Sequence, residues 1–161
     1  MTRTILALIV VGVFGLATAP AKAHHSFSAE FDSKAPVLLR GKVTKVEWVN
    51  PHAWVHIEVT DENGGVTPWM VEGGTPNTLV RAGVDRNTIK PGTEIIVRGY
   101  QSKDRICEPA CKANGRDITF TDGRKIFMGS SGTGAPRDGT DPRERGQQPD
   151  TDLPALEDVD Q

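Results

Sequence analysis

The fold is decided by the stretch RGKVTKVEWV at residues 40–49 and by AWVHIEVT at residues 53–60, which an Asn-Pro break separates. Apolar and polar residues alternate in both segments, a pattern typical of strands with one buried face. In the first segment the alternation slips by one residue at Thr44-Lys45, and a glycine occupies position 41; either position favours a β-bulge or a sharp bend. With the apolar residues 37–39 in front, this strand exceeds the usual length of about five to six residues.

The second segment has two chemically different faces. An extended chain places alternate side chains on opposite sides of a sheet. One side carries Val55, Ile57 and Val59, and the other carries Trp54, His56 and Glu58. If the segment is a strand, His56 therefore shares a face with Trp54.

Further elements follow along the chain. They are a hairpin turn at 61–65, a third strand at 66–72, a short helix at 75–83 with a Thr cap, an early Pro and a final Gly, a fourth strand at 93–100, and two short strands at 116–120 and 124–128. This order predicts a mainly β fold, a small OB-like Greek-key β-barrel with one short helix between strands three and four. A small β-sandwich is the alternative architecture.

The first 23 residues have the three parts of a secretory signal peptide. A positively charged start is followed by an apolar run at residues 5–17, and Ala21-Lys22-Ala23 offers a small-x-small cleavage site. The run is too short to span a bilayer. We therefore expect a signal peptide at 1–23, a mature protein that begins at His24 in the periplasm or outside the cell, and no membrane span after cleavage.

Charge and composition divide the mature chain. Of the 19 basic and 21 acidic residues, Arg3 and Lys22 belong to the signal peptide, which leaves 17 basic and 21 acidic residues and a net charge of −4. This balance argues against a nucleic-acid-binding surface. Residues 129–161 hold eight acidic and three basic residues and few large apolar ones. They predict a disordered acidic tail after a single β domain at 24–128.

Cys107 and Cys111 are the two cysteines of the sequence. In an oxidising compartment two cysteines most simply form one disulfide, which here closes a small loop. A thioredoxin-type redox pair would have two residues between its cysteines, and this pair has three. A copper site that uses the thiols is a further alternative. We expect a structural disulfide.

Several short motifs occur in an order that resembles a known family. They are HHSF at 24–27, GxV at 41–43, EWVNPH at 47–52, GxTP at 73–76, Leu79, RxG at 81–83, PG at 91–92 and DGR at 122–124. Together they look like the exported bacterial proteins grouped as the domain of unknown function 6152. The resemblance covers the mature domain up to Met128 and implies a periplasmic or secreted β protein without an assigned activity. The cysteine-containing segment after Gln101 departs from the family pattern.

The four histidines, His24, His25, His52 and His56, all lie in the first third of the mature domain. Imidazole is a common ligand of copper and zinc. After cleavage His24 would carry a free amine and an imidazole on one residue. A second imidazole would complete a T-shaped nitrogen set that suits Cu(II). His52 follows the strand break, where a loop can meet the amino terminus, and is the favoured partner.

The remaining candidate ligands have ordinary structural alternatives. His25 and His56 could also bind the metal, and Glu30 or Asp32 could neutralise part of its charge. Alternatively, His52 caps the Asn-Pro turn and His56 is an exposed cross-strand partner. Closed-spacing metal motifs such as CxxC and HExxH do not occur in the sequence.

Aromatic residues suggest a second kind of site. Trp48, Trp54 and Trp69 could stack on a sugar or a peptide, although we expect Trp48 and Trp69 to fill the core. The sequence has no nucleophile elbow and no triad spacing, so we expect no enzymatic activity. The leading hypothesis is an exported module that binds an unknown ligand, such as a glycan, a peptide or an envelope protein. The alternative is Cu(II) binding, and a small exported enzyme is the third hypothesis.

The signal peptide gives the first testable prediction. Mass spectrometry of the exported protein should find an amino terminus at His24, because Ala23 completes the cleavage pattern. A cut after Ala21 would leave Lys22-Ala23-His24, which also binds Cu(II) but through backbone amides. Recovery of the full-length chain in the cytosolic fraction would contradict the prediction.

Overall fold

The computed structural model describes residues 27–129. The signal peptide expected at 1–23, the residues His24 and His25, and the tail from residue 130 onward lie outside this range. The described elements are α2 (Phe27–Glu30), β1 (Phe31–Glu47), β2 (Trp54–Thr60), β3 (Val66–Glu72), α3 (Pro76–Arg81), β4 (Glu94–Ser102), β5 (Cys111–Phe120) and β6 (Lys125–Phe127). No helix within residues 27–129 has the length and apolar character needed to cross a membrane.

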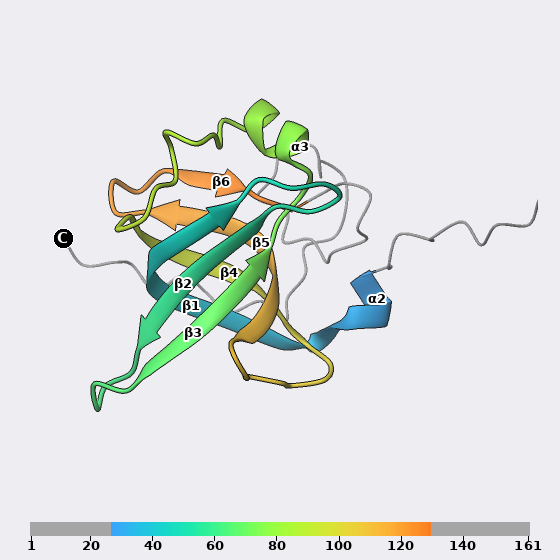
Figure 1. Ribbon diagram of the computed structural model, residues 1–161, viewed down its shortest axis with the longest axis vertical. Helices are drawn as coiled ribbons and strands as arrows, with labels where there is room; N and C mark the ends of the chain where they lie inside the picture. Colours follow the sequence, from blue (N-terminus) through green and yellow to red (C-terminus); the bar gives the residue numbers. More distant parts are fainter. Residues whose placement is uncertain (1–26, 130–161) are drawn as a thin grey trace, which may run out of the picture.

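The six strands form one sheet that closes on itself. Their order is β3-β2-β1-β4-β5-β6, and a further parallel pairing joins β3 to β5. This connectivity is that of an OB barrel, with α3 between β3 and β4. Figure 1 shows α3 over one end of the ring, and the β2–β3 hairpin and the β4–β5 loop at the other end. The OB-like prediction is therefore confirmed over the sandwich alternative.

Strand β1 belongs to both halves of the barrel because it bends. Its first half pairs with β4 and its second half with β2, and Gly41 lies opposite both Val59 and Ile95. A Cβ atom at Gly41 would come within 2.5 Å of the Glu58 carbonyl oxygen. The register slips between Val43 and Lys45, so the sequence-predicted bulge at Thr44-Lys45 is confirmed.

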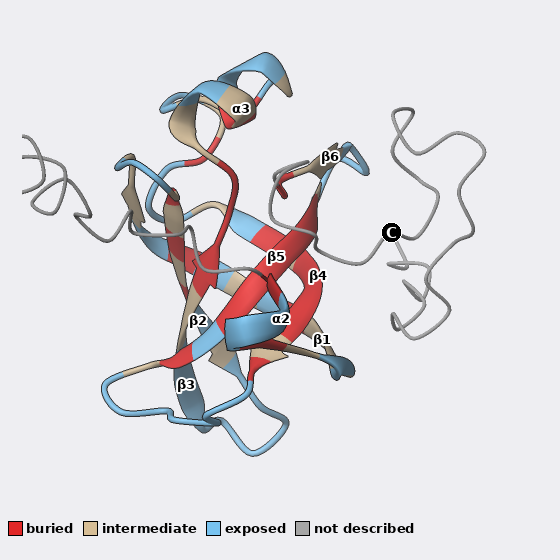
Figure 2. Ribbon diagram, turned by 90° about the vertical axis from the view of Figure 1, so that its right-hand side faces the viewer, coloured by how far each residue is buried: buried red, intermediate tan, exposed pale blue. Residues whose placement is uncertain are grey.

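The barrel interior is aliphatic. Val55 and Ile57 of β2 are buried, and Trp48 and Trp69 are partly buried against the core as expected. Figure 2 shows that the buried residues are concentrated on β4 and β5. Helix α3 begins as its sequence predicts, because the Thr75 hydroxyl accepts a hydrogen bond from the Thr78 amide, and Leu79 extends the core under the helix.

Two elements differ from the prediction. A second short helix, α2, precedes β1, so the fold has two short helices rather than one. Its Phe27 packs on Phe31 and Tyr100 in a small separate core. The contact with Tyr100 joins distant parts of the chain, so the sequence of the four-residue helix does not predict it. Strand β5 begins at Cys111 rather than at residue 116. Residues 111–115 have a weak preference for strands, but pairing with β3 on one side and β4 on the other holds them in an extended conformation.

The disulfide is confirmed. Cys107 and Cys111 are bonded, and the described residues contain no free cysteine. The bond closes the β4–β5 loop directly before β5, and Cys111 itself is buried opposite Trp69. The bonded thiols are therefore not available as metal ligands.

The close approach of β4 and β5 gives a stability prediction. A Cβ atom at Gly99 would lie 2.0 Å from the Asn114 carbonyl oxygen, which belongs to the backbone and cannot rotate away. Gly99→Ala should lower the free energy of unfolding by about 1–3 kcal/mol, as overpacked sites do. Urea denaturation measures this change. Lys42→Ala is the control because the Lys42 side chain is 60% exposed, and equal stability of the two variants would contradict the close approach.

Candidate functional site

The outer face of β2, β3 and β5 carries two rows of side chains set by strand register. OB barrels commonly bind ligands on this face and its flanking loops. The His56 row contains Lys45, His56, Met70 and Lys112, and the Trp54 row contains Glu47, Trp54, Glu72 and Asn114. The prediction that His56 and Trp54 share a face is therefore confirmed.

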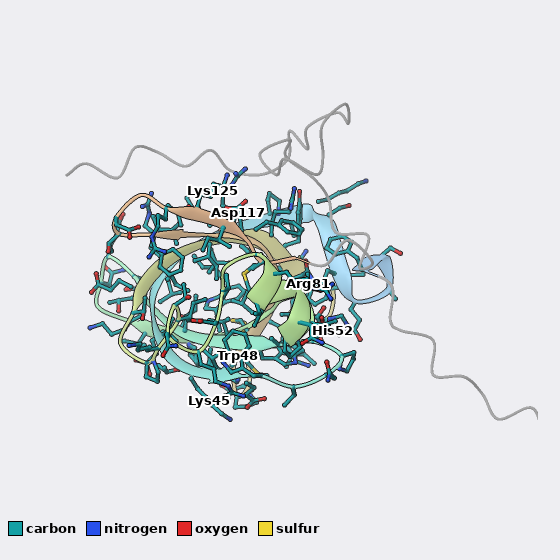
Figure 3. All side chains as sticks on the ribbon, turned by 90° about the horizontal axis from the view of Figure 1, so that it is seen from above. Lys45, Trp48, His52, Arg81, Asp117 and Lys125 are labelled. Carbon is teal, nitrogen blue, oxygen red and sulfur yellow. A yellow bond between two sulfur atoms is a disulfide. The ribbon has the colours of Figure 1, made fainter. Side chains whose placement is uncertain are left out.

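His52 lies in the loop between β1 and β2, next to Glu72 of the Trp54 row. Its Nδ1 is 3.3 Å from the Gly73 carbonyl oxygen and 3.6 Å from Glu72 Oε1. Both partners are acceptors, so Nδ1 is the donor nitrogen, and Nε2 is the ring nitrogen that a metal could take. The ring is held by the chain between β3 and α3 rather than by the Asn50-Pro51 turn. Figure 3 shows His52 next to α3.

Glu72 connects His52 to the small Phe27 core. The Asn114 side-chain amide donates to Glu72 Oε1 at 3.3 Å, and both residues are buried. Asn114 lies opposite Tyr100 in the β4–β5 register. The Tyr100 ring in turn meets Phe27 edge-on, with the ring centres 5.7 Å apart. A continuous line of neighbours therefore runs across the outer face from α2 to His52.

His56 has a different environment. Its side chain is 20% exposed, and its Nε2 lies 3.5 Å from Glu47 Oε1, which also pairs with Lys45. Burial lowers the pKa of His56, and the Glu47 charge opposes that shift. The hydrogen bond from Lys45 lowers the pKa of Glu47. His56 is therefore a neutral, partly buried imidazole next to a carboxylate that stays charged.

The described residues do not form a complete metal cage. Within residues 27–129 no group of three or more His, Cys, Asp or Glu side chains is placed to hold a metal ion. His52 and His56 each have one carboxylate neighbour, Glu72 for His52 and Glu47 for His56. Asp32 is already paired with Arg105, at 2.6 Å. A site with three or more of these ligands therefore needs residues such as His24 or His25, which lie outside the described range.

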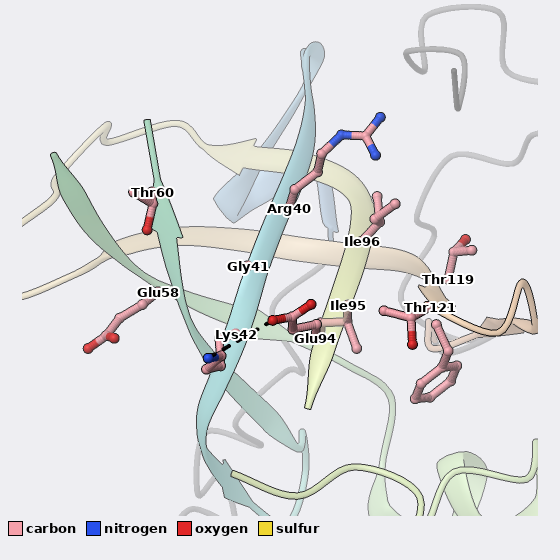
Figure 4. A pocket seen from close by; sticks show the side chains of 11 residues that line it. Arg40, Gly41, Lys42, Glu58, Thr60, Glu94, Ile95, Ile96, Thr119 and Thr121 are labelled. Atoms are coloured by element: carbon pink, nitrogen blue, oxygen red, sulfur yellow. Dashed lines mark ion pairs between the residues drawn. The ribbon is translucent and has the colours of Figure 1, made fainter. Parts of the chain in front are cut away.

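The barrel surface has two grooves that could take a ligand. One, of about 380 Å³, lies beside the indole of Trp54 and is lined by Ala29, Glu30, Phe31, Trp54, Ser102, Lys103, Asp104 and Lys112. The other, of about 430 Å³, runs over β1, β4 and the end of β5 (Figure 4). Lys42 and Glu94 form an exposed ion pair within it, at 4.0 Å. The Trp54 groove is lined by one residue of each row, Trp54 and Lys112.

The sequence analysis did not identify three residues of this face as candidate site residues: Met70, Glu72 and Asn114. Met70 and Glu72 alternate with Val71 in a predicted strand, so their shared outward direction could have been inferred. Asn114 lies in a segment that gives no strand signal. Its position opposite Glu72 depends on the parallel β3–β5 pairing, which joins residues far apart in the chain.

A comparison with protein families finds a match. A family model described as "Family of unknown function (DUF6152)" matches residues 13–108. This range covers more than half of the sequence and ends inside the disulfide loop, so β5 and β6 follow it. Among curated proteins, none matches this chain.

The environment of His56 gives a testable prediction. Nuclear magnetic resonance titration should find the pKa of His56 below the usual value of about 6.5, because burial disfavours the imidazolium. Glu47→Gln should lower this pKa further, because it removes the negative charge that stabilises the imidazolium. Glu58→Gln, on the same strand face but outside both rows, is the control. A His56 pKa above the usual value, or one unmoved by Glu47→Gln, would contradict the assignment.

Proposed function

This chain belongs to the family of unknown function DUF6152, and we propose that it is an exported β-barrel module that binds Cu(II) at the His52 end of the Trp54 row. The protein is a binding module rather than an enzyme. It acts in the periplasm or outside the cell, and its partners are the metal ion and an envelope protein that delivers or receives it.

The orientation of His52 carries this proposal. Histidines that bind metals usually donate their second ring nitrogen to a backbone carbonyl or a carboxylate, which fixes the tautomer and raises the basicity of the ligating nitrogen. His52 has this arrangement, with Gly73 and Glu72 as the acceptors. The Glu72 carboxylate also offers negative charge close to a bound cation.

The position of Phe27 supports the participation of the amino terminus. His24 precedes Phe27 by three residues, a distance of at most about 11 Å in an extended chain. Phe27 is fixed on Tyr100, whose strand partner Asn114 bonds to Glu72 next to His52. Cleavage after Ala23 would release an amine and an imidazole three residues before Phe27, at the α2 end of this line of contacts. These groups supply the nitrogen ligands that the described residues lack.

A second candidate function is favoured by the groove beside Trp54. Its volume of about 380 Å³ and its mixture of an indole with charged side chains suit a sugar or a short peptide. Such binding would survive a chelator, whereas Cu(II) binding would not. Titration of the protein with glycans and peptides, with and without a chelator, separates the two functions.

Calorimetric titration with Cu(II) tests the main proposal. Mature protein that begins at His24 should bind one ion. His24→Ala and His52→Ala should each weaken binding by roughly tenfold or more, since even the loss of a residue that only orients a ligand costs this much. His25→Ala should weaken it less.

Two controls sharpen this experiment. One extra residue before His24 displaces the free amine from the imidazole and should weaken binding, while the fold is unchanged. His56→Ala should leave Cu(II) binding intact, because His56 lies in the other row. If Cu(II) does not bind, or if binding survives both His24→Ala and His52→Ala, the proposal is wrong.

A further inference from the structure

The His56 row contains a second pair of candidate ligands that the Cu(II) proposal does not use. His56 and Met70 are direct partners in the antiparallel register of β2 and β3. Side chains of direct partners stand on the same face, with their Cβ atoms about 4.5–5.5 Å apart. A metal ion bound between an imidazole nitrogen and a thioether sulfur fits across a pair of this spacing.

The imidazole of His56 is suited to bind a metal. Its Nε2 lies 3.5 Å from the charged Glu47 carboxylate on β1, so the ring proton belongs on Nε2 and the lone pair on Nδ1. The Nδ1 lone pair is therefore the one that a metal ion can take. Burial also keeps the ring neutral, the form that coordinates metals.

Met70 determines which metal fits. Thioether sulfur is a soft ligand that selects Cu(I) over harder ions. Met128 is fully buried in the core and Met1 belongs to the expected signal peptide, so Met70 is the methionine that a metal can reach. Met70 is partly buried, with its side chain on the outer face next to His56.

The charges around the pair tolerate a monovalent cation. Lys45, the neighbour of His56 on β1, is paired with Glu47. Lys112, the neighbour of Met70 on β5, interacts electrostatically with Asp104. Trp54 stands two positions from His56 on the same face of β2, where its indole can shield a bound cation from water and attract it.

We propose that His56 and Met70 form a site for a soft monovalent ion, Cu(I), separate from the Cu(II) site at His52. The two proposals share no ligand and concern different oxidation states, so either can fail without the other. The barrel would then hold copper in both oxidation states on one outer face, with Cu(I) in the His56 row and Cu(II) next to the Trp54 row.

Silver(I), a stable substitute for Cu(I), tests the site. Mature protein with its disulfide intact is titrated with silver nitrate in chloride-free buffer, by calorimetry and by nuclear magnetic resonance of the methionine methyl groups. The Met70 methyl and the His56 ring signals should shift together on binding, and the Met128 methyl should not. This measurement uses the unmodified protein, so it does not depend on the stability of a variant.

Substitutions complete the test. Met70→Leu and His56→Gln keep the size of the side chains and should each weaken silver binding by roughly tenfold or more. His52→Gln and His24→Ala should leave it unchanged. Absence of silver binding, binding that Met70→Leu does not alter, or binding that depends on His52 or His24 would overturn the proposal.

Discussion

The structure depends on one strand that pairs with two partners. Strand β1 is 17 residues long and pairs with β4 and then with β2. A flat strand of this length would join its partners into an open sheet. The bend at Gly41 and the bulge before Lys45 turn the sheet instead, so that β3 meets β5 in parallel. Closure of the barrel then follows from curvature that β1 supplies.

Closure also builds the outer face. The parallel pairing places Met70 beside Lys112 and Glu72 beside Asn114. The β1–β2 pairing adds Lys45 and Glu47 on the other side. Each row thus combines side chains from segments that are distant in the sequence. Because the bulge in β1 sets which of its residues face outward, a shift of one residue would exchange the inner and outer sets.

The two histidines of the described chain acquire different chemistry from these rows. His52 lies in a loop, and its ring is oriented by a carbonyl and a carboxylate. His56 lies in a strand, half enclosed between a carboxylate on β1 and a thioether on β3. The first environment favours a harder, more highly charged ion, and the second favours a softer one. Phe27, docked on Tyr100, is linked to the first environment through Asn114 and Glu72.

The sequence by itself determined the elements: the strand 66–72, the strand at 53–60 (54–60 in the structure), the bulge, the capped helix, the disulfide and the shared face of Trp54 and His56. Each of these depends on residues close together in the chain, through alternation, capping or spacing. Only the tertiary structure decided that β5 begins at Cys111, that α2 packs on Tyr100, and that Glu72 meets both His52 and Asn114. These contacts join segments that are distant in the sequence. Local conformational preferences cannot predict them, because the contacts stabilise the protein only after the barrel has closed.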